Sequence, residues 1–200
     1  MRRRITITKD MILAKAGEVF SQTGFKKTTM EQIARALNRA KSSIYYYFTS
    51  KEDIYSTIIE KESMVMSDEL DKSVGNAFHA YDKLRAYIAT RIQLIQQLRN
   101  LRIALEDHNL AHYTFIQRLR DDHLNREIEK IKSILSEGVA ANQLEIENVD
   151  DAASAIFFSM RSIESIRGIR QRFNTIRSNL DTFLEMLFKG IGKKPAQDTI

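Results

Sequence analysis

Hydrophobic residues recur at helical spacing from the start of the chain. Within residues 8–25 they lie three and four positions apart on one stripe, which predicts an amphipathic helix. Gly24 follows the stripe, where a helix can end in a left-handed cap. The stripe consists of Ile12, Leu13, Ala16, Val19 and Phe20.

A second, shorter stripe lies in residues 28–38 and ends at Asn38, a residue type that tolerates positive φ. Thr29 precedes it as a candidate N-cap, and Gln32, three residues later, can complete a capping box. A third short helix begins near Ala40. Two short helices joined by so few residues predict a helix-turn-helix.

Three consecutive tyrosines, Tyr45, Tyr46 and Tyr47, stand between the apolar residues Ile44 and Phe48. Adjacent helical residues point about 100° apart, so three neighbours cannot share one buried face. Ile44 and Phe48, four positions apart, can share the face that packs on the first two helices. A single tyrosine could instead seal this small core, but the set of three predicts a surface that contacts a partner.

Beyond residue 50 the chain has the pattern of long helices with short joints. Stripes predict helices over residues 51–73, 81–98, 113–143, 149–173 and 178–191. We expect Met64 or Val65 on the inner side of the first of these, and Asp150 or Asp151 as the N-cap of the fourth. Because 7 glycines and 1 proline leave few turns for a sheet, the predicted fold class is all-α.

Charge is distributed unevenly along the chain. Residues 1–51 contain 11 Lys or Arg and 3 acidic residues, whereas residues 52–200 contain 20 basic and 23 acidic residues. A basic segment at one end of a chain indicates contact with a polyanion, and nucleic acid is the most common one.

Composition excludes several other classes. The absence of cysteine removes disulfides, thiolate metal sites and cysteine nucleophiles. No run approaches the roughly 18 apolar residues of a membrane span, so we expect a cytoplasmic protein with no membrane partner. His108 and His112, beside Asp107, could share a metal on one helical face, as in a small metal-dependent hydrolase. No zinc-protease motif or glycine-rich phosphate loop accompanies them, so we expect no catalytic residue, cofactor or metal.

The combination of "VFSQTGF", "TT", "IA" and "IYYYFTSKEDIY" within residues 9–55 resembles the TetR family of bacterial transcriptional repressors. The resemblance covers about a quarter of the chain. It implies an N-terminal three-helix head that binds DNA and a C-terminal helical body that binds an effector and dimerises, with about nine helices in all. We expect residues 1–50 to form the DNA-binding domain and residues 51–200 the effector-binding and dimerisation domain.

The resemblance also implies which residues contact DNA. Lys41, Ser42 and Ser43 open the recognition helix, whose first residues usually reach base edges. Thr29 and Lys51 begin the helices on either side, where they would position the protein on phosphates. Among the tyrosines, Tyr45 and Tyr47 match positions that contact the phosphate backbone or the groove edge, and Tyr46 lies beside them.

Three residues depart from the family pattern. Asn38 stands where glycine is usual, Arg39 where an apolar residue packs, and Ala40 where a serine caps the recognition helix. The missing cap should cost about 1 kcal/mol. We expect a looser turn, with Arg39 turned outward to a phosphate.

The last two helices carry apolar bands broader than one stripe, so each should bury two surfaces. Related repressors pair these helices with those of a second subunit in a four-helix bundle, whereas an ordinary internal helix is the alternative. The predicted homodimer interface consists of Ala152, Ala155, Ser159, Ile163, Leu180, Phe183, Leu184 and Leu187.

Aromatic and methionine side chains in the body could line a cavity for a small apolar or amphipathic effector, although such residues at helical spacing also form ordinary cores. The candidates are Met64, Tyr81, Tyr87, Tyr113, Phe115 and Phe158.

The predicted function is a TetR-like transcriptional regulator, a repressor that binds double-stranded palindromic operator DNA as a homodimer and is released by an effector. A DNA-binding regulator without an effector, either architectural or regulated by a partner, is the alternative, and the metal-dependent hydrolase is a remote one. The sequence identifies no operator, regulated gene or effector.

Overall fold

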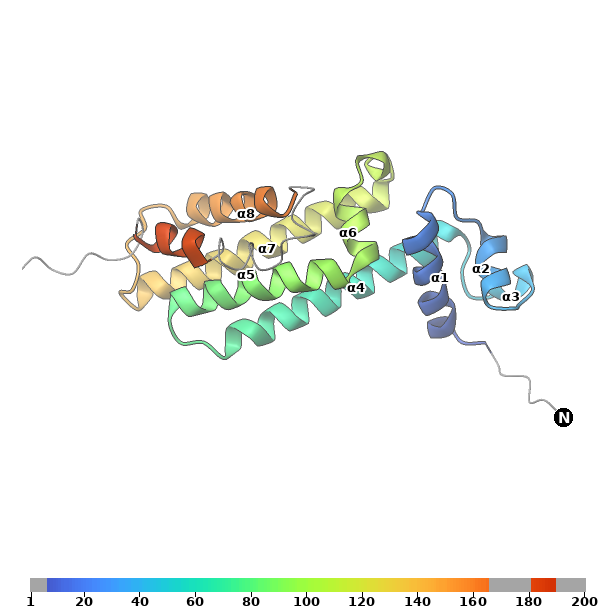
Figure 1. Ribbon diagram of the computed structural model, residues 1–200, viewed down its shortest axis with the longest axis horizontal. Coiled ribbons are helices and arrows are strands. Elements are labelled where there is room, and N and C mark those ends of the chain that lie inside the picture. Colours follow the sequence, from blue (N-terminus) through green and yellow to red (C-terminus); the bar gives the residue numbers. More distant parts are fainter. Residues whose placement is uncertain (1–6, 166–180, 190–200) are drawn as a thin grey trace, which may run out of the picture. The chain divides into compact units, whose positions relative to one another are not determined.

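The protein is described by a computed structural model (Figure 1), which describes the backbone of residues 7–165 and 181–189. Side chains are described for residues 7–161 and 181–189. These ranges contain helices joined by turns and no β-strand, so the all-α prediction is confirmed. A further helix spans residues 181–189. The labelled helices are α1 (Lys9–Thr23), α2 (Met30–Ala36), α3 (Lys41–Tyr45), α4 (Lys51–Gly75), α5 (Ala80–Gln97), α6 (Arg99–Glu106), the 3-10 helix η1 (His108–Leu110), α7 (Thr114–Ala140) and α8 (Val149–Ser165).

The chain packs as two compact units. The first comprises Met1–Val65 and Ile95–Arg120, and the second comprises Met66–Leu94 and Asp121–Ile200. The units reflect packing, so the functional division at residue 50 stays a prediction.

The first unit is built around a cluster of aromatic rings. Phe25 follows α1 and lies with its ring centroid 4.8 Å from that of Tyr55 on α4 and 5.1 Å from that of Tyr113. Phe20 and Phe115 complete the cluster, at 5.9 Å each from Phe25. Offset and edge-to-face ring pairs of this kind add stability beyond their buried area. They fix the loop that leads from α1 into α2.

Helix α6 was absent from the sequence-based prediction, and its N-terminal cap explains why. Its N-cap residue, Leu98, provides no side-chain bond. Instead, the carboxylate of Glu62 on α4 accepts from Leu101 N at 2.7 Å and from Asn100 Nδ2 at 2.9 Å. The carboxylate that caps this helix therefore lies far away in the sequence.

The second unit is a bundle of α5, α7, α8 and the second half of α4, which run lengthwise beside one another in Figure 1. Ion pairs connect neighbouring helices at their surfaces. Lys130 on α7 lies 2.5 Å from Asp71 on α4, and Lys132 on α7 lies 2.5 Å from Asp150 on α8. Such exposed pairs contribute little stability, so the bundle depends on its apolar core.

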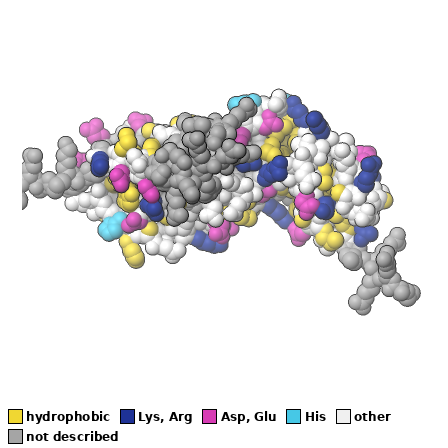
Figure 2. All heavy atoms as spheres, in the orientation of Figure 1, with side chains coloured by type: hydrophobic (Ala, Val, Ile, Leu, Met, Phe, Trp, Pro, Cys, Tyr) yellow, Lys and Arg dark blue, Asp and Glu magenta, His cyan; other side chains and the backbone are white. Residues whose placement is uncertain are grey.

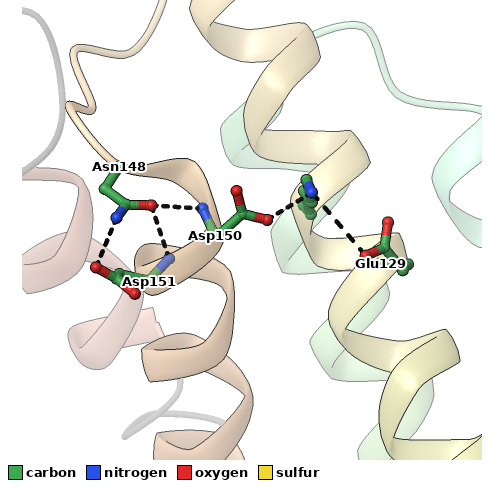
Figure 3. A network of polar contacts seen from close by, with 5 residues as sticks. Glu129, Asn148, Asp150 and Asp151 are labelled. Carbon is green, nitrogen blue, oxygen red and sulfur yellow. Dashed lines mark hydrogen bonds and ion pairs between the residues drawn. The ribbon is translucent and has the colours of Figure 1, made fainter.

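The N-cap of α8 is Asn148, not Asp150 or Asp151 as expected. Its Oδ1 accepts from the backbone N–H groups of both aspartates at 3.1 Å, and its Nδ2 donates to the Asp151 carboxylate at 2.6 Å (Figure 3). The two carboxylates then lie in the first turn, where the helix dipole favours negative charge.

The expectation that Met64 or Val65 lies on the inner side of α4 was wrong. Met64 is 65% exposed and Val65 is 48% exposed, whereas Met66 is fully buried. The buried stripe of this long helix therefore continues through Met66 and Leu70. No helix in the described ranges is both long enough and apolar enough to cross a membrane.

Candidate nucleic-acid interface

The turn between α2 and α3 is a Schellman motif centred on Asn38. Asn38 has a φ of 53°, its N–H donates to Arg35 O at 3.0 Å, and the N–H of Arg39 donates to Ala34 O at 3.0 Å. These two bonds satisfy carbonyls that would otherwise be left open at the end of α2. Asparagine is tolerated at this φ, so the departure from glycine preserves the turn.

The starts of both helices of the helix-turn-helix, α2 and α3, follow the sequence-based prediction. Thr29 Oγ1 accepts from Gln32 N at 3.3 Å, and Gln32 Oε1 accepts from Thr29 N at 2.8 Å, so the capping box on α2 is confirmed. Ala40 is the N-cap residue of α3 and forms no side-chain cap, as its residue type predicts. Ile44 and Phe48 are buried, which anchors α3 and the residues after it to the core of the head.

The three tyrosines differ in what their hydroxyl groups can do. Tyr45 is 45% exposed and Tyr46 is 83% exposed. Tyr47 is half-buried, and its hydroxyl donates to the carbonyl of Ile7 at 2.8 Å. A phenol has one proton and a phosphate oxygen can only accept, so this bond competes with the predicted phosphate contact. Tyr47 therefore fixes the chain at the start of α1.

We expect the double change Tyr45→Phe and Tyr46→Phe to weaken DNA binding by about 1–3 kcal/mol without affecting folding, because exposed donors to charged phosphates are lost. Tyr47→Phe serves as the matched comparison, and should instead lower the unfolding free energy by about 0.5–1.5 kcal/mol. DNA titrations by fluorescence anisotropy and thermal unfolding, applied to all variants, measure both effects. Weaker DNA binding confined to Tyr47→Phe would reverse these roles.

Lys51 has a structural role that the sequence did not reveal. Its ammonium donates to Phe25 O at 3.0 Å, Lys26 O at 3.2 Å and Thr28 O at 3.1 Å, and lies 4.6 Å from the centroid of the Phe25 ring. These contacts use the three donors of the ammonium. Lys51 thus fixes the loop between α1 and α2, and its phosphate contact stays a prediction.

The first residues of α3 lie on the surface, as base-reading residues must. Lys41 and Ser42 are exposed and Ser43 is half-buried. Lys41 forms an ion pair with Glu31 in the first turn of α2, and its ammonium lies 5.5 Å from the centroid of the Tyr45 ring. The hydrogen bond to Lys41 lowers the pKa of Glu31, and the same bond raises the pKa of Lys41.

An open hollow of about 560 Å³ adjoins this ion pair, and it is lined by Glu31, Ala34, Arg35, Asn38, Arg39 and Lys41. Figure 2 shows basic and acidic side chains next to each other over the part that carries α1 to α3. The face is therefore of mixed sign, with basic residues in the majority around the hollow.

Residues of the predicted dimer interface divide between surface and core. On α8, Ala155 and Ser159 are exposed and Ala152 is half-buried. In the helix over residues 181–189, Phe183 and Leu187 are half-buried, but Leu184 is fully buried and belongs to the core of its own subunit. Leu180 and the side chain of Ile163 lie outside the described residues.

The six candidate effector contacts are divided between the two compact units. Met64, Tyr113 and Phe115 belong to the first compact unit, and Tyr113 and Phe115 pack in its aromatic cluster. Tyr81, Tyr87 and Phe158 belong to the second unit. Phe158 is 56% exposed, Tyr87 is fully buried, and Tyr81 packs against Phe188 with ring centroids 4.8 Å apart. Tyr81 and Tyr87 both lie on α5, and the effector contacts stay a prediction.

The histidine pair does not have the predicted geometry. His108 lies in the 3-10 helix η1, which ends at Leu110, and His112 lies in the turn that follows. The shared face of an α-helix is therefore missing, because α6 ends at Glu106 and Asp107 caps η1. Among the described residues, no group of three His, Asp or Glu side chains could hold a metal ion.

A buried polar cluster in the second unit was not predicted. Arg91 on α5 forms an ion pair with Glu127 on α7, and Glu127 Oε1 lies 2.9 Å from His123 Nε2. Burial would raise the pKa of Glu127, but the charge of Arg91 and the neighbouring His123 outweigh it and lower the pKa from 4.5 to about 2. The sequence contained one indication of this cluster. Its polar residues stand at positions where the helical stripes would place apolar ones.

A capped two-helix motif, anchored by buried residues and exposing tyrosines and a lysine, defines a helix-turn-helix protein that binds DNA. Comparison with known families agrees, since residues 12–58 match the bacterial regulatory proteins of the tetR family. Residues 12–58 therefore carry the DNA-binding domain of TetR-family transcriptional regulators.

Similarity to a regulator of fatty acid metabolism extends beyond the head. The fatty acid metabolism regulator protein of Bacillus subtilis is 24% identical over 189 residues, which cover 92% of this chain and 95% of that protein. The biofilm operon icaADBC negative transcriptional regulator IcaR of Staphylococcus epidermidis is 38% identical over 52 residues, 26% of this chain and 28% of IcaR. This second similarity is therefore local.

The structure of the transcriptional regulator FadR from Bacillus subtilis in complex with stearoyl-CoA has the same fold. It superimposes with a TM-score of 0.74 at 22% identity, over 92% of this chain and 100% of FadR. The arrangement of helices is thus shared along almost the whole chain.

Proposed function

We propose that the protein is a homodimeric repressor in the bacterial cytoplasm that binds a palindromic operator and is released by a small amphipathic effector. The capped helix-turn-helix carries the DNA-binding part of this proposal, because it presents Lys41, Tyr45 and Tyr46 on one exposed surface. In a dimer, two such heads spaced roughly 34–36 Å apart would fit successive turns of the major groove.

Repression is supported by the similarity of the head to IcaR, a negative regulator. Residues 1–50 would form the DNA-binding domain, and residues 51–200 would bind the effector and the second subunit. The wide apolar bands of α8 and of residues 181–189 support dimerisation through these helices.

For the effector we propose a long-chain acyl-CoA thioester. The full-length similarity is to a fatty acid metabolism regulator, and the FadR structure contains stearoyl-CoA. Such a ligand is amphipathic, as the sequence-based hypothesis requires. It must bind the free dimer more tightly than the DNA-bound dimer, because only differential affinity can shift the equilibrium.

The test uses the DNA upstream of the protein's own gene. Footprinting should show a protected palindrome, and stearoyl-CoA should weaken the affinity for that duplex by roughly 5- to 150-fold. The same ligand should raise the melting temperature of the free protein. Free coenzyme A is the control and should do neither.

The outcomes separate the alternatives. If a palindrome is protected but neither stearoyl-CoA nor shorter acyl-CoA thioesters change the affinity, the protein is a regulator without an acyl-CoA effector. If DNA binds without any sequence preference, the operator-binding function is wrong.

A further inference from the structure

The ion pair between Glu31 and Lys41 joins the two helices of the motif across the turn. Glu31 lies in the first turn of α2 and Lys41 is the first residue of α3, ten positions later. Both side chains are about half exposed, at 52% and 46%. The pair therefore stands on the surface that must approach DNA.

Glu31 changes the kind of acceptor that Lys41 can bind. A lysine ammonium has three donors, and the Glu31 carboxylate uses one of them, so Lys41 keeps donor capacity for DNA. A phosphate that approached these donors would also approach the carboxylate and be repelled by it. The N7 and O6 atoms of guanine carry no formal charge, so they can accept from Lys41 without this penalty.

The carboxylate also has a partner of its own in the major groove. Cytosine presents its N4 amino group there as a donor, beside the acceptors of the paired guanine, and glutamate can accept from it. A lysine and a glutamate held side by side thus match the donor and acceptor pattern of one G·C pair.

Other residues near the hollow can supply positive charge for the phosphates of the DNA backbone. Arg35 and Arg39 line the same hollow as the ion pair. Arginine binds phosphate well because its planar guanidinium matches the phosphate oxygens. Lys41 is therefore not needed as a phosphate contact on this face.

We propose that Glu31 is a specificity-determining residue, which holds Lys41 as a reader of a G·C pair and prevents it from acting as a general phosphate contact. This inference rests on the proposed DNA-binding function and extends it to the base that is read. The pKa of Glu31 is lowered, which agrees with a carboxylate that stays ionised while it performs this role.

The experiment selects duplexes from a random-sequence library with the full-length wild-type protein, Glu31→Gln and Lys41→Gln. Affinities for the wild-type-selected duplex and for a scrambled duplex of the same composition are then measured at several salt concentrations. Glu69→Gln is the matched control, since it removes a glutamate from an exposed ion pair with Lys72, outside the unit that contains the motif.

We expect wild type to select a G·C pair at one position in each half-site, and Glu31→Gln to lose this preference. The ratio of selected to scrambled affinity should fall about tenfold per half-site, the usual effect of one base contact. It should fall because scrambled DNA binds more tightly, with a salt slope larger by about one per subunit as Lys41 moves to a phosphate. Lys41→Gln should lose the same preference but bind scrambled DNA more weakly, and Glu69→Gln should match wild type.

Each failure has a distinct meaning. If wild type selects no sequence, the proposed operator-binding function is wrong, and this inference falls with it. If wild type selects a duplex and Glu31→Gln retains the same preference and the same affinity ratio, this inference alone is overturned. Circular dichroism melting of every variant separates these results from misfolding, and Lys41→Gln tests the base contact even if Glu31→Gln is unstable.

Discussion

Replacing Arg91 with methionine should lower the free energy of unfolding by about 3–5 kcal/mol. Arg91 and Glu127 are 2% and 5% exposed, so the substitution leaves a carboxylate in the core without its main counter-charge. The cost arises from that unpaired charge, because methionine occupies much of the space of the arginine stem. Urea unfolding at a fixed protein concentration measures the effect.

Arg85→Met is the matched control on the same helix. Arg85 pairs with Asp181 at 3.0 Å, but both side chains are more than 40% exposed. An exposed pair of this kind is worth about 0–1 kcal/mol, so its removal should have little effect. If Arg91→Met cost no more than Arg85→Met, the buried pair would contribute no more than a surface pair.

The double variant Arg91→Met and Glu127→Leu distinguishes a need for charge from a need for packing. Removing both charges should return the stability to within about 1.5 kcal/mol of wild type, since no charge is left unpaired. Wild type should also lose a contribution in acid that the double variant lacks. Because the pKa of folded Glu127 is about 2, against an ordinary value of 4.5, this contribution is complete above pH 4.5 and is lost as the pH falls through 2.

The parts of the head that the sequence predicted correctly depend on near neighbours. The capping box of Thr29 and Gln32, the positive φ of Asn38 and the buried pair of Ile44 and Phe48 each require residues no more than four positions apart. Turn and cap chemistry of this range follows from residue type and spacing. The helix-turn-helix could therefore be predicted without a structure.

The parts that were missed depend on distant partners. The hydroxyl of Tyr47 bonds to Ile7, the ammonium of Lys51 bonds to the loop after α1, and Glu62 caps α6. In each case the residue type suggested an exposed polar side chain, and tertiary packing gave it an internal partner. Hydrophobic periodicity contains no information about such partners.

The candidate effector contacts show the same limit for apolar residues. A helical stripe shows which residues face inward, but not which of several helices they face. Tyr113 and Phe115 were therefore predicted to line a cavity. In the structure they pack with Phe25 beside the loop that leads into α2. Residue type alone does not separate a cavity wall from an ordinary core.

The surface of α8 allows a sharp test of the proposed dimer. Ala155, Phe158 and Ser159 are exposed at positions i, i+3 and i+4, which form one face of the helix. Ile156 and Phe157 are buried on the other face. An aromatic residue between two small ones on an exposed helical face suits close packing against a second subunit. We therefore propose Phe158, which the sequence-based hypothesis treats as an effector contact, as an interface residue as well.

Phe158→Asp should convert the proposed dimer to a folded monomer. An aromatic residue at the centre of an interface contributes about 2 kcal/mol or more, and a two-fold interface contains it twice. The dissociation constant should thus rise roughly a thousandfold, which sedimentation equilibrium can measure. Because Phe158 is 56% exposed within its subunit, the melting curve of the monomer should retain a cooperative transition. Leu184→Asp, at a fully buried site, would unfold the chain and is not a substitute.

The affinity for the operator should decrease when Phe158→Asp dissociates the dimer. Two linked heads gain affinity because the second head binds at a high effective concentration, and a monomer loses this gain. Phe78→Asp is the matched control, since Phe78 is 93% exposed in the connection between α4 and α5 and lies outside the proposed interface. It should leave both the dimer and operator binding unchanged. If Phe158→Asp stayed dimeric at low micromolar concentration while remaining folded, the second subunit would have to pack on another surface, and the exposed face of α8 would need a different partner.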